Sequence, residues 1–336
     1  MNSLNIRLPD DFHVHLRQGP AMAAYAATTA RRFGRFMAMP NVMPPLTGPA
    51  ALADYARAVA AAVAASGYAA TPLACFKLTP GMGREAVFSC AAAGAVAGKY
   101  YPAGATTNSS DGVPEPSAVA EELTAMQEAG LVLSIHGEDP SAPALERERA
   151  FLGVVDSIVG SYPRLRVALE HLSCAESVRA VLAWPERVAA TITAHHLSFT
   201  IDDLLGGSLR PELFCKPVLK SAADRAALLE AAVSGSPRFF FGSDSAPHQP
   251  EAKAAGAAGC YTAPVALSLL AAAFEEAGAL DRLEAFVSVS GARFYGLGPN
   301  PGVLRLRRES WTVPASVDGA VPPAAGRTLA WAAERA

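Results

Sequence analysis

Eight short apolar segments, separated by longer stretches of helical composition, limit the folds open to this chain more than any other feature. They lie at residues 11–17, 35–39, 71–78, 94–100, 131–136, 166–170, 187–193 and 238–242. Apolar strands that alternate with helices favour a parallel sheet covered by helices, and eight of them over about 240 residues fit a closed (β/α)8 barrel. We therefore predict an α/β fold of the (β/α)8 TIM-barrel type. We expect a single domain over residues 1–336, with a Pro- and Gly-rich tail from about residue 296 that wraps the barrel.

The composition narrows the class of protein. Hydrophobic residues make up 51% and charged residues 18% of the chain, enough for a large buried core. The net charge of -3 argues against a nucleic-acid-binding surface. The five cysteines are scattered and form no CxxC pair, which favours a reducing compartment over a disulfide framework. No signal peptide and no bilayer-length apolar run are recognisable, so we expect a cytoplasmic protein without a membrane partner.

The first apolar segment carries side chains suited to metal binding. Within residues 11–17, apolar residues alternate with His13, His15 and Arg17, so these three side chains are expected on one face of a strand. Two neighbouring histidines can bind one metal ion through neutral imidazole nitrogens, and Arg17 could then bind an anion beside it. On this stretch alone, a pair of surface histidines on an edge strand remains an equal alternative.

Further candidate ligands stand at the ends of other predicted strands. His136 ends the fifth segment, His171 follows the sixth, and Asp244 follows the eighth. A single buried histidine is more often a hydrogen-bonded core residue than a ligand. Several at corresponding ends of parallel strands instead predict one site at the carboxyl-terminal rim, where barrel enzymes place their catalytic groups. Nitrogen and carboxylate oxygen ligands of this kind suit zinc.

At this point the motifs resemble those of the dihydroorotases of the amidohydrolase superfamily, in their shorter bacterial form, over nearly the whole chain. The resemblance rests on Asp11–Arg17, Met39–Asn41, Gly98–Pro102, Thr106–Ser110, Ile135–Glu138, Glu170–His171, Lys216–Lys220 and Asp244–His248. It implies the amidohydrolase type of barrel. It also implies dihydroorotase activity, the reversible cyclisation of N-carbamoyl-L-aspartate to L-dihydroorotate with loss of water, the third step of pyrimidine synthesis. A homodimer is the expected assembly.

The resemblance further implies a set of metal ligands. Lys99 is expected to be carboxylated to N6-carboxylysine and to bridge two zinc ions. One ion would be held by His13, His15 and Asp244, and the other by His136 and His171.

Roles in substrate binding and proton transfer follow from the same resemblance. Asp244 is expected to act as general base and general acid. The expected substrate-binding residues are Arg17, Asn41 and His248 for the carboxylate, Leu219 and Ala258 through backbone groups, and Thr106 and Thr107 in a loop that closes over the site.

Two other functions stay open at this stage. A hydantoinase- or allantoinase-like hydrolase of cyclic amides could use the same metal ligands, although Arg17, Asn41 and His248 argue for a substrate carboxylate. An inactive barrel that serves as a binding partner is the second alternative, but none of the expected ligands is missing. His195 and His196 have no assigned role, and we expect them to be structural.

Overall fold

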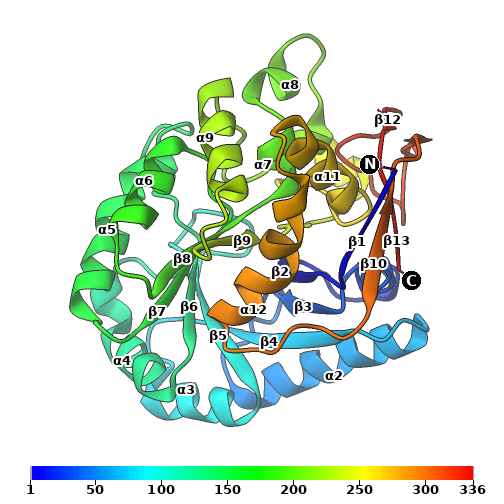
Figure 1. The fold of residues 1–336 in the computed structure, drawn as a ribbon. Coiled ribbons are helices and arrows are strands. Elements are labelled where there is room, and N and C mark those ends of the chain that lie inside the picture. The colour runs from blue at the N-terminus through cyan, green and yellow to red at the C-terminus, as the bar shows by residue number, and fades with distance from the viewer. Residues whose placement is uncertain (1, 336) are drawn as a thin grey trace.

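The computed structural model describes residues 2–335 and contains an eight-stranded parallel sheet in which the strands follow one another in chain order. The strands are β2 (Asp10–Val14), β3 (Arg35–Ala38), β4 (Thr71–Lys77), β5 (Ala95–Tyr100), β6 (Val132–Ile135), β7 (Arg166–Leu169), β8 (Val188–Ile192) and β9 (Phe239–Phe241). The two edges of the sheet meet where Val14 bridges Ser245 just beyond β9, and the amide of His15 donates to the carbonyl of Ser245 at 2.8 Å. The predicted (β/α)8 barrel is therefore confirmed (Figure 1).

Helices surround the barrel and connect its strands (Figure 1). They are α1 (Ala21–Ala30), α2 (Pro49–Ala65), α3 (Gly83–Ala92), α4 (Ala120–Ala129), α5 (Arg147–Ser161), α6 (Ala175–Ala183), α7 (Ala194–Ser198), α8 (Ile201–Leu205), α9 (Ala222–Val233), α10 (Pro250–Ala254), α11 (Ala266–Glu276) and α12 (Ser290–Phe294). Among the described residues, none of these helices has the length and apolar character needed to cross a bilayer.

Helix α2 illustrates why these segments form helices. It is rich in alanine, the residue with the highest helix propensity, and Pro49 occupies its first turn, where the missing N–H costs nothing. Its buried residues are Leu52, Tyr55, Val59 and Val63, spaced three or four apart, so they form one apolar face against the sheet.

The barrel interior is packed with side chains and is not a channel. Inward-pointing Phe12, Met37 and Phe240 alternate with small residues such as Ala97 on neighbouring strands. Tyr295 closes the amino-terminal end of the barrel, because its ring stacks on that of Phe12 with the ring centroids 4.7 Å apart. The polar side chains that line a cavity lie at the opposite, carboxyl-terminal rim.

The two ends of the chain meet in a second sheet. β1 (Ser3–Arg7) pairs antiparallel with β10 (Val303–Arg307), which in turn pairs with β13 (Ala332–Arg335), while β11 (Trp311–Thr312) pairs with β12 (Thr328–Leu329). The fully buried Trp331 attaches this region to α11, because its indole N–H donates to the Glu275 carboxylate at 3.0 Å. Figure 1 shows both termini on this side of the barrel.

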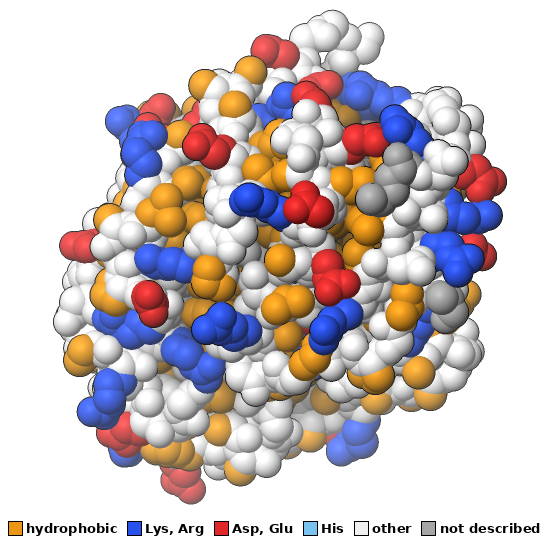
Figure 2. Space-filling model, in the orientation of Figure 1, with side chains coloured by type: hydrophobic (Ala, Val, Ile, Leu, Met, Phe, Trp, Pro, Cys, Tyr) orange, Lys and Arg blue, Asp and Glu red, His pale blue; other side chains and the backbone are white. Residues whose placement is uncertain are grey.

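The surface carries both signs of charge. Across the face drawn in Figure 2, Lys and Arg side chains lie mixed with Asp and Glu side chains. This distribution matches the small net charge of the chain.

One expectation about the first strand is wrong. Strand β2 ends at Val14, and Arg17 has a left-handed backbone with φ 61°, so Arg17 does not continue the alternation of His13 and His15. Arg17 nevertheless lines the same cavity as His13 and His15.

Candidate active site

A cavity opens at the carboxyl-terminal rim of the barrel, with an empty volume of about 390 Å³. We call it the rim cavity. Its lining residues are His13, His15, Arg17, Asn41, Tyr101, Thr106, Thr107, His136, His171, Lys216, Asp244, Ala246, Ala258 and Gly259. Ten of these were candidates from the sequence alone, and they come from segments up to about 245 positions apart.

His13, His15 and Asp244 form a compact group of possible metal ligands. The Nε2 atoms of His13 and His15 lie 3.3 and 3.2 Å from the same oxygen, Oδ1 of Asp244. All three residues are buried, and their ligand atoms lie within 4.8 Å of one another. Asp244 has a left-handed backbone with φ 45°, a conformation that Asp tolerates better than most residues, and this turn follows directly after β9.

A buried carboxylate fixes the orientation of His13. Nδ1 of His13 lies 2.9 Å from Oε2 of Glu170, and Glu170 also accepts hydrogen bonds from Ser134 and Thr191. A carboxylate in this position keeps the proton on Nδ1, so that Nε2 can present a lone pair toward Asp244. At 3.3 Å these two atoms share a proton unless a metal ion takes its place, and the arrangement suits such an ion.

The protonation state of Asp244 suits a ligand or base. Burial alone would raise the pKa of the Asp244 carboxyl. Hydrogen bonds with His13 and His15 and the electrostatic effect of His13 outweigh burial and hold this pKa well below its ordinary range. The carboxylate is therefore ionised at neutral pH.

Lys99 is a buried amine without a partner. Its side chain is fully buried, and Nζ makes no hydrogen bond; the nearest aromatic ring is that of Tyr101, with its centroid 5.4 Å away. Burial lowers the pKa of Lys99, so the neutral, nucleophilic amine is more accessible than in a surface lysine. Lys77, its register partner on β4, is equally buried but donates to the carbonyl of Asn108 at 2.8 Å and to Asp111.

His136 and His171 form a second pair of nitrogen ligands beside the first group. Nδ1 of His136 lies 3.1 Å from Nε2 of His171, and the His171 ring centroid lies 5.1 Å from that of His13. Nε2 of His136 lies 2.8 Å from Oε2 of Glu138 and forms a hydrogen bond with it. Nδ1 of His171 is buried without a partner, and burial holds the pKa of His171 well below its ordinary value, in the neutral form that binds metals.

Arg17 and Asn41 give the cavity groups that can bind an anion. The Arg17 side chain is oriented by His248, whose Nε2 lies 2.7 Å from Nη2, and by the carbonyl of Pro247, which accepts from Nε at 2.9 Å. Oδ1 of Asn41 is buried without a hydrogen-bond partner. Arg17 and Asn41 thus both line the rim cavity, whereas His248 does not line it and contacts Arg17 from behind.

The loop with Thr106 and Thr107 borders the same cavity and is held at its base. Ser109 accepts from the amide of Thr106 and donates to its carbonyl, while Lys216 donates to the carbonyl of Ala105 at 3.1 Å. Thr107 itself is exposed, so the tip of the loop has few contacts that would resist movement.

Several residues depart from the sequence-based expectations. Leu219 is fully buried and, like the deeper Lys99, is not among the residues that line the cavity. Lys216 and Tyr101 do line it, although neither was given a role. The only available signal was their place within the motifs Lys216–Lys220 and Gly98–Pro102.

Comparison with known proteins adds independent findings. Residues 11–313 match the Amidohydrolase family. The chain is 45% identical to a dihydroorotase of Azoarcus sp. (strain BH72), covering 98% of this chain and 99% of the relative. It is 46% identical to a dihydroorotase of Laribacter hongkongensis (strain HLHK9), again over 98% and 99% of the two chains.

Solved structures give the same picture. The crystal structure of the Saccharomyces cerevisiae dihydroorotase in complex with 5-fluoroorotic acid superposes with a TM-score of 0.93 at 33% identity, covering 100% of this chain and 99% of that one. The L-hydantoinase (dihydropyrimidinase) of Arthrobacter aurescens superposes with a TM-score of 0.83 at 17% identity, covering 98% and 83%, a likeness that concerns the fold alone.

Proposed function

Because this chain belongs to the dihydroorotases of the amidohydrolase family, we propose that it interconverts N-carbamoyl-L-aspartate and L-dihydroorotate, the third step of pyrimidine synthesis. The observation that carries this proposal is one cavity that combines His13, His15 and Asp244 with the anion-binding Arg17. The reaction needs both parts, a centre that activates water and a group that binds the substrate carboxylate.

We further propose that two zinc ions occupy the rim cavity. His13, His15 and Asp244 would hold one ion, His136 and His171 the other, and Lys99, as N6-carboxylysine, would bridge them. The unpartnered Nζ of Lys99 and Nδ1 of His171 support this assignment, since buried polar atoms rarely stay unsatisfied. When bound, zinc supplies Lewis acidity and lowers the pKa of water toward neutrality.

Asp244 moves the proton in this proposal. In hydrolysis its carboxylate accepts a proton from the attacking water and then donates it to the ring nitrogen that leaves. In cyclisation the same oxygen accepts the proton of the attacking amide nitrogen and donates it to the hydroxide that leaves the substrate carboxyl, so that water is released. Its lowered pKa keeps the carboxylate ready to act as a base.

The remaining residues bind and orient the substrate. Arg17, Asn41 and His248 would bind the carboxylate, the first through the planar fork of its guanidinium. Backbone groups of Leu219 and Ala258 would contact the ring. Thr106 and Thr107 would close over the reacting carbonyl and exclude bulk water.

A substrate comparison tests the activity. We expect the zinc-loaded protein to turn over L-dihydroorotate, and to act much more slowly on hydantoin, allantoin and dihydrouracil, which lack the carboxylate. Equal or faster turnover of the uncharged rings would instead favour a hydantoinase-like enzyme. The absence of any turnover in metal-loaded protein would favour a barrel that only binds a partner.

Assembly, location and domain organisation belong to the same proposal. We expect a homodimer, as in the family, and a single folding unit that includes the tail after residue 296. The five cysteines are unpaired, which supports a reducing cytoplasm. Sedimentation of the purified protein tests the dimer.

A further inference from the structure

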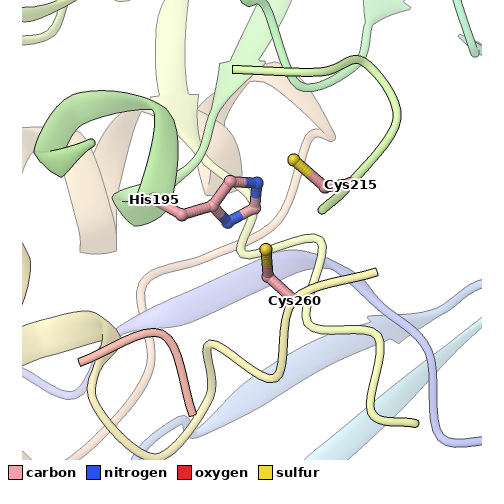
Figure 3. Close-up of side chains that lie close together, drawn as sticks. All are labelled: His195, Cys215 and Cys260. Atoms are coloured by element: carbon pink, nitrogen blue, oxygen red, sulfur yellow. The ribbon is translucent and has the colours of Figure 1, made fainter. Parts of the chain in front are cut away.

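A second group of metal-binding side chains lies outside the rim cavity. It consists of His195, Cys215 and Cys260, which we call the Cys–His cluster; their ligand atoms lie within 4.8 Å of one another, and all three residues are 0% exposed. Figure 3 shows the imidazole of His195 beside the two sulfur atoms, which come from separate loops. None of the three residues has a part in the proposed reaction.

The imidazole of His195 is oriented as in a metal site. Its Nδ1 lies 3.1 Å from the hydroxyl of Thr262, whereas Nε2 is buried and has no hydrogen-bond partner. If Nδ1 carries the proton and donates to Thr262, Nε2 presents a free lone pair. The adjacent His196 differs, because Thr193 and the carbonyl of Pro217 occupy both of its nitrogens. Of these two histidines, only His195 has a ring nitrogen without a hydrogen-bond partner.

The two thiols supply two further ligands, so that the cluster offers three of the four that a structural zinc ion takes. Without a cation, the hydrogen bond with Cys260 and burial raise the pKa of the Cys215 thiol. In that state Sγ of Cys215 donates to the carbonyl of Pro217 at 3.2 Å. Binding of a cation would release the thiol protons and leave two thiolates, whose charge the cation compensates. A divalent cation bound to two thiolates and a neutral imidazole leaves no net charge, so it could be buried here without a further counter-ion. Zinc prefers sulfur and nitrogen ligands of this kind.

We propose that the Cys–His cluster binds a structural zinc ion, in addition to the metal ions of the rim cavity. In a reducing compartment, cysteines that converge with a histidine serve metal binding more often than disulfide formation.

The position of the Cys–His cluster indicates what the ion would do. Cys215 directly precedes Lys216, and Cys260 directly follows Gly259, both of which line the rim cavity. The two loops already contact each other, since the amide of Gly259 donates to the carbonyl of Phe214 at 2.8 Å. An ion at the Cys–His cluster would attach both loops to α7, which carries His195, and so hold this wall of the substrate site in place.

Cobalt provides a direct test on the whole protein. The full chain is produced in minimal medium with Co²⁺ as the only added transition metal, and its near-ultraviolet spectrum is recorded. Thiolate bound to Co²⁺ gives an intense charge-transfer band, whereas the nitrogen and oxygen ligands proposed for the rim cavity do not. We expect this band in the unmodified protein. Protein grown on zinc should contain one more zinc ion per chain than the variant with Cys215→Ser and Cys260→Ser.

Variants separate the cluster from the other cysteines. The band should disappear in the double serine variant and change in His195→Gln, while Cys90→Ser, a buried cysteine of α3, should retain it. If a variant fails to fold, the presence or absence of the charge-transfer band in the unmodified protein still tests the proposal. Absence of the band there, its persistence in the double variant, or a Cys215–Cys260 disulfide found by mass spectrometry would each overturn the proposal.

Discussion

Nη2 of Arg17 lies 2.7 Å from Nε2 of His248, a residue 231 positions further along the chain. The same Nε2 also lies 3.0 Å from the carbonyl oxygen of Ala258. In the tautomer with the proton on Nδ1, Nε2 accepts from the guanidinium, which can only donate; in the other tautomer, Nε2 donates to Ala258. Burial and the charge of Arg17 lower the pKa of His248 to about 4, consistent with a neutral ring. His248 therefore orients the guanidinium, and the charge that attracts the substrate carboxylate comes from Arg17.

This relationship makes Arg17→Lys an informative change. Lysine keeps the charge but loses the planar fork and the bond to His248, so we expect kcat/KM to fall by roughly 10- to 150-fold, on the order of 1.5–3 kcal/mol. Steady-state kinetics with L-dihydroorotate measure the effect, and the exposed Arg31→Lys serves as the control. Unchanged kinetics in Arg17→Met would remove Arg17 from the substrate site.

Lys99 and Lys77 form a matched pair for testing the metal bridge. Both are fully buried and are register partners on adjacent strands, but only Lys77 has hydrogen-bond partners. We expect Lys99→Ala to lose activity and at least one tightly bound metal ion, and added formate or acetate to restore part of the turnover by replacing the bridge. Lys77→Ala should keep its metal content even if it weakens the loop at Asn108. A fully metallated, active Lys99→Ala protein would contradict the two-metal proposal.

Asp244→Asn separates metal binding from proton transfer. Asparagine still offers a carbonyl oxygen to a metal, but it cannot accept a proton. We expect most of the metal to remain and kcat to fall roughly 10²–10⁴-fold, the usual effect of removing a positioned base.

The pH dependence gives the second readout for Asp244. Because the pKa of Asp244 is lowered, its carboxylate is ionised above that value, and activity in hydrolysis should be lost only as the pH falls through it. Asp244→Asn should lack this acidic limb, and Asp244→Ala should also lose metal. Near-normal turnover of Asp244→Asn with the limb in place would assign the proton to another group.

The double change Thr106→Ala with Thr107→Val tests the loop. Metal content and thermal stability should stay close to normal, since Thr107 is exposed and Thr106 only half-buried. We expect turnover to fall on the order of 10²-fold if the hydroxyls hold the closed loop over the substrate. Thr124→Ala on α4 is the control, and wild-type kinetics in the double variant would make the loop an ordinary solvated turn.

The barrel could be predicted from the sequence because each of its strands is a short apolar segment that can be recognised locally. Segments such as Phe239–Phe241 are apolar along their whole length, as strands covered on both faces must be. The sheet of β1, β10 and β13 was not predicted. Its strands alternate buried and exposed residues only over five positions, and the partner of Ile6, Leu304, lies almost 300 residues away.

In the site too, residues marked by a local sequence pattern could be predicted, and contacts between distant segments could not. His136, His171 and Asp244 were found because they follow apolar strands, a relationship visible within a few residues. Glu170 was not given its role beside His13, since that contact depends on how two strands 157 positions apart are placed. The Cys–His cluster was missed for the same reason, because its two cysteines lie in loops whose paths no local pattern specifies.

The pairing of β1 with β10 has a consequence for how the protein is made. During synthesis, residues 3–7 leave the ribosome about 300 residues before their hydrogen-bonding partners at 303–307. The first strand must therefore wait, unpaired, through the synthesis of the whole barrel, and its exposed edge is open to other chains during that time. The wait ends only when residues 303–307 have left the ribosome and can pair with residues 3–7.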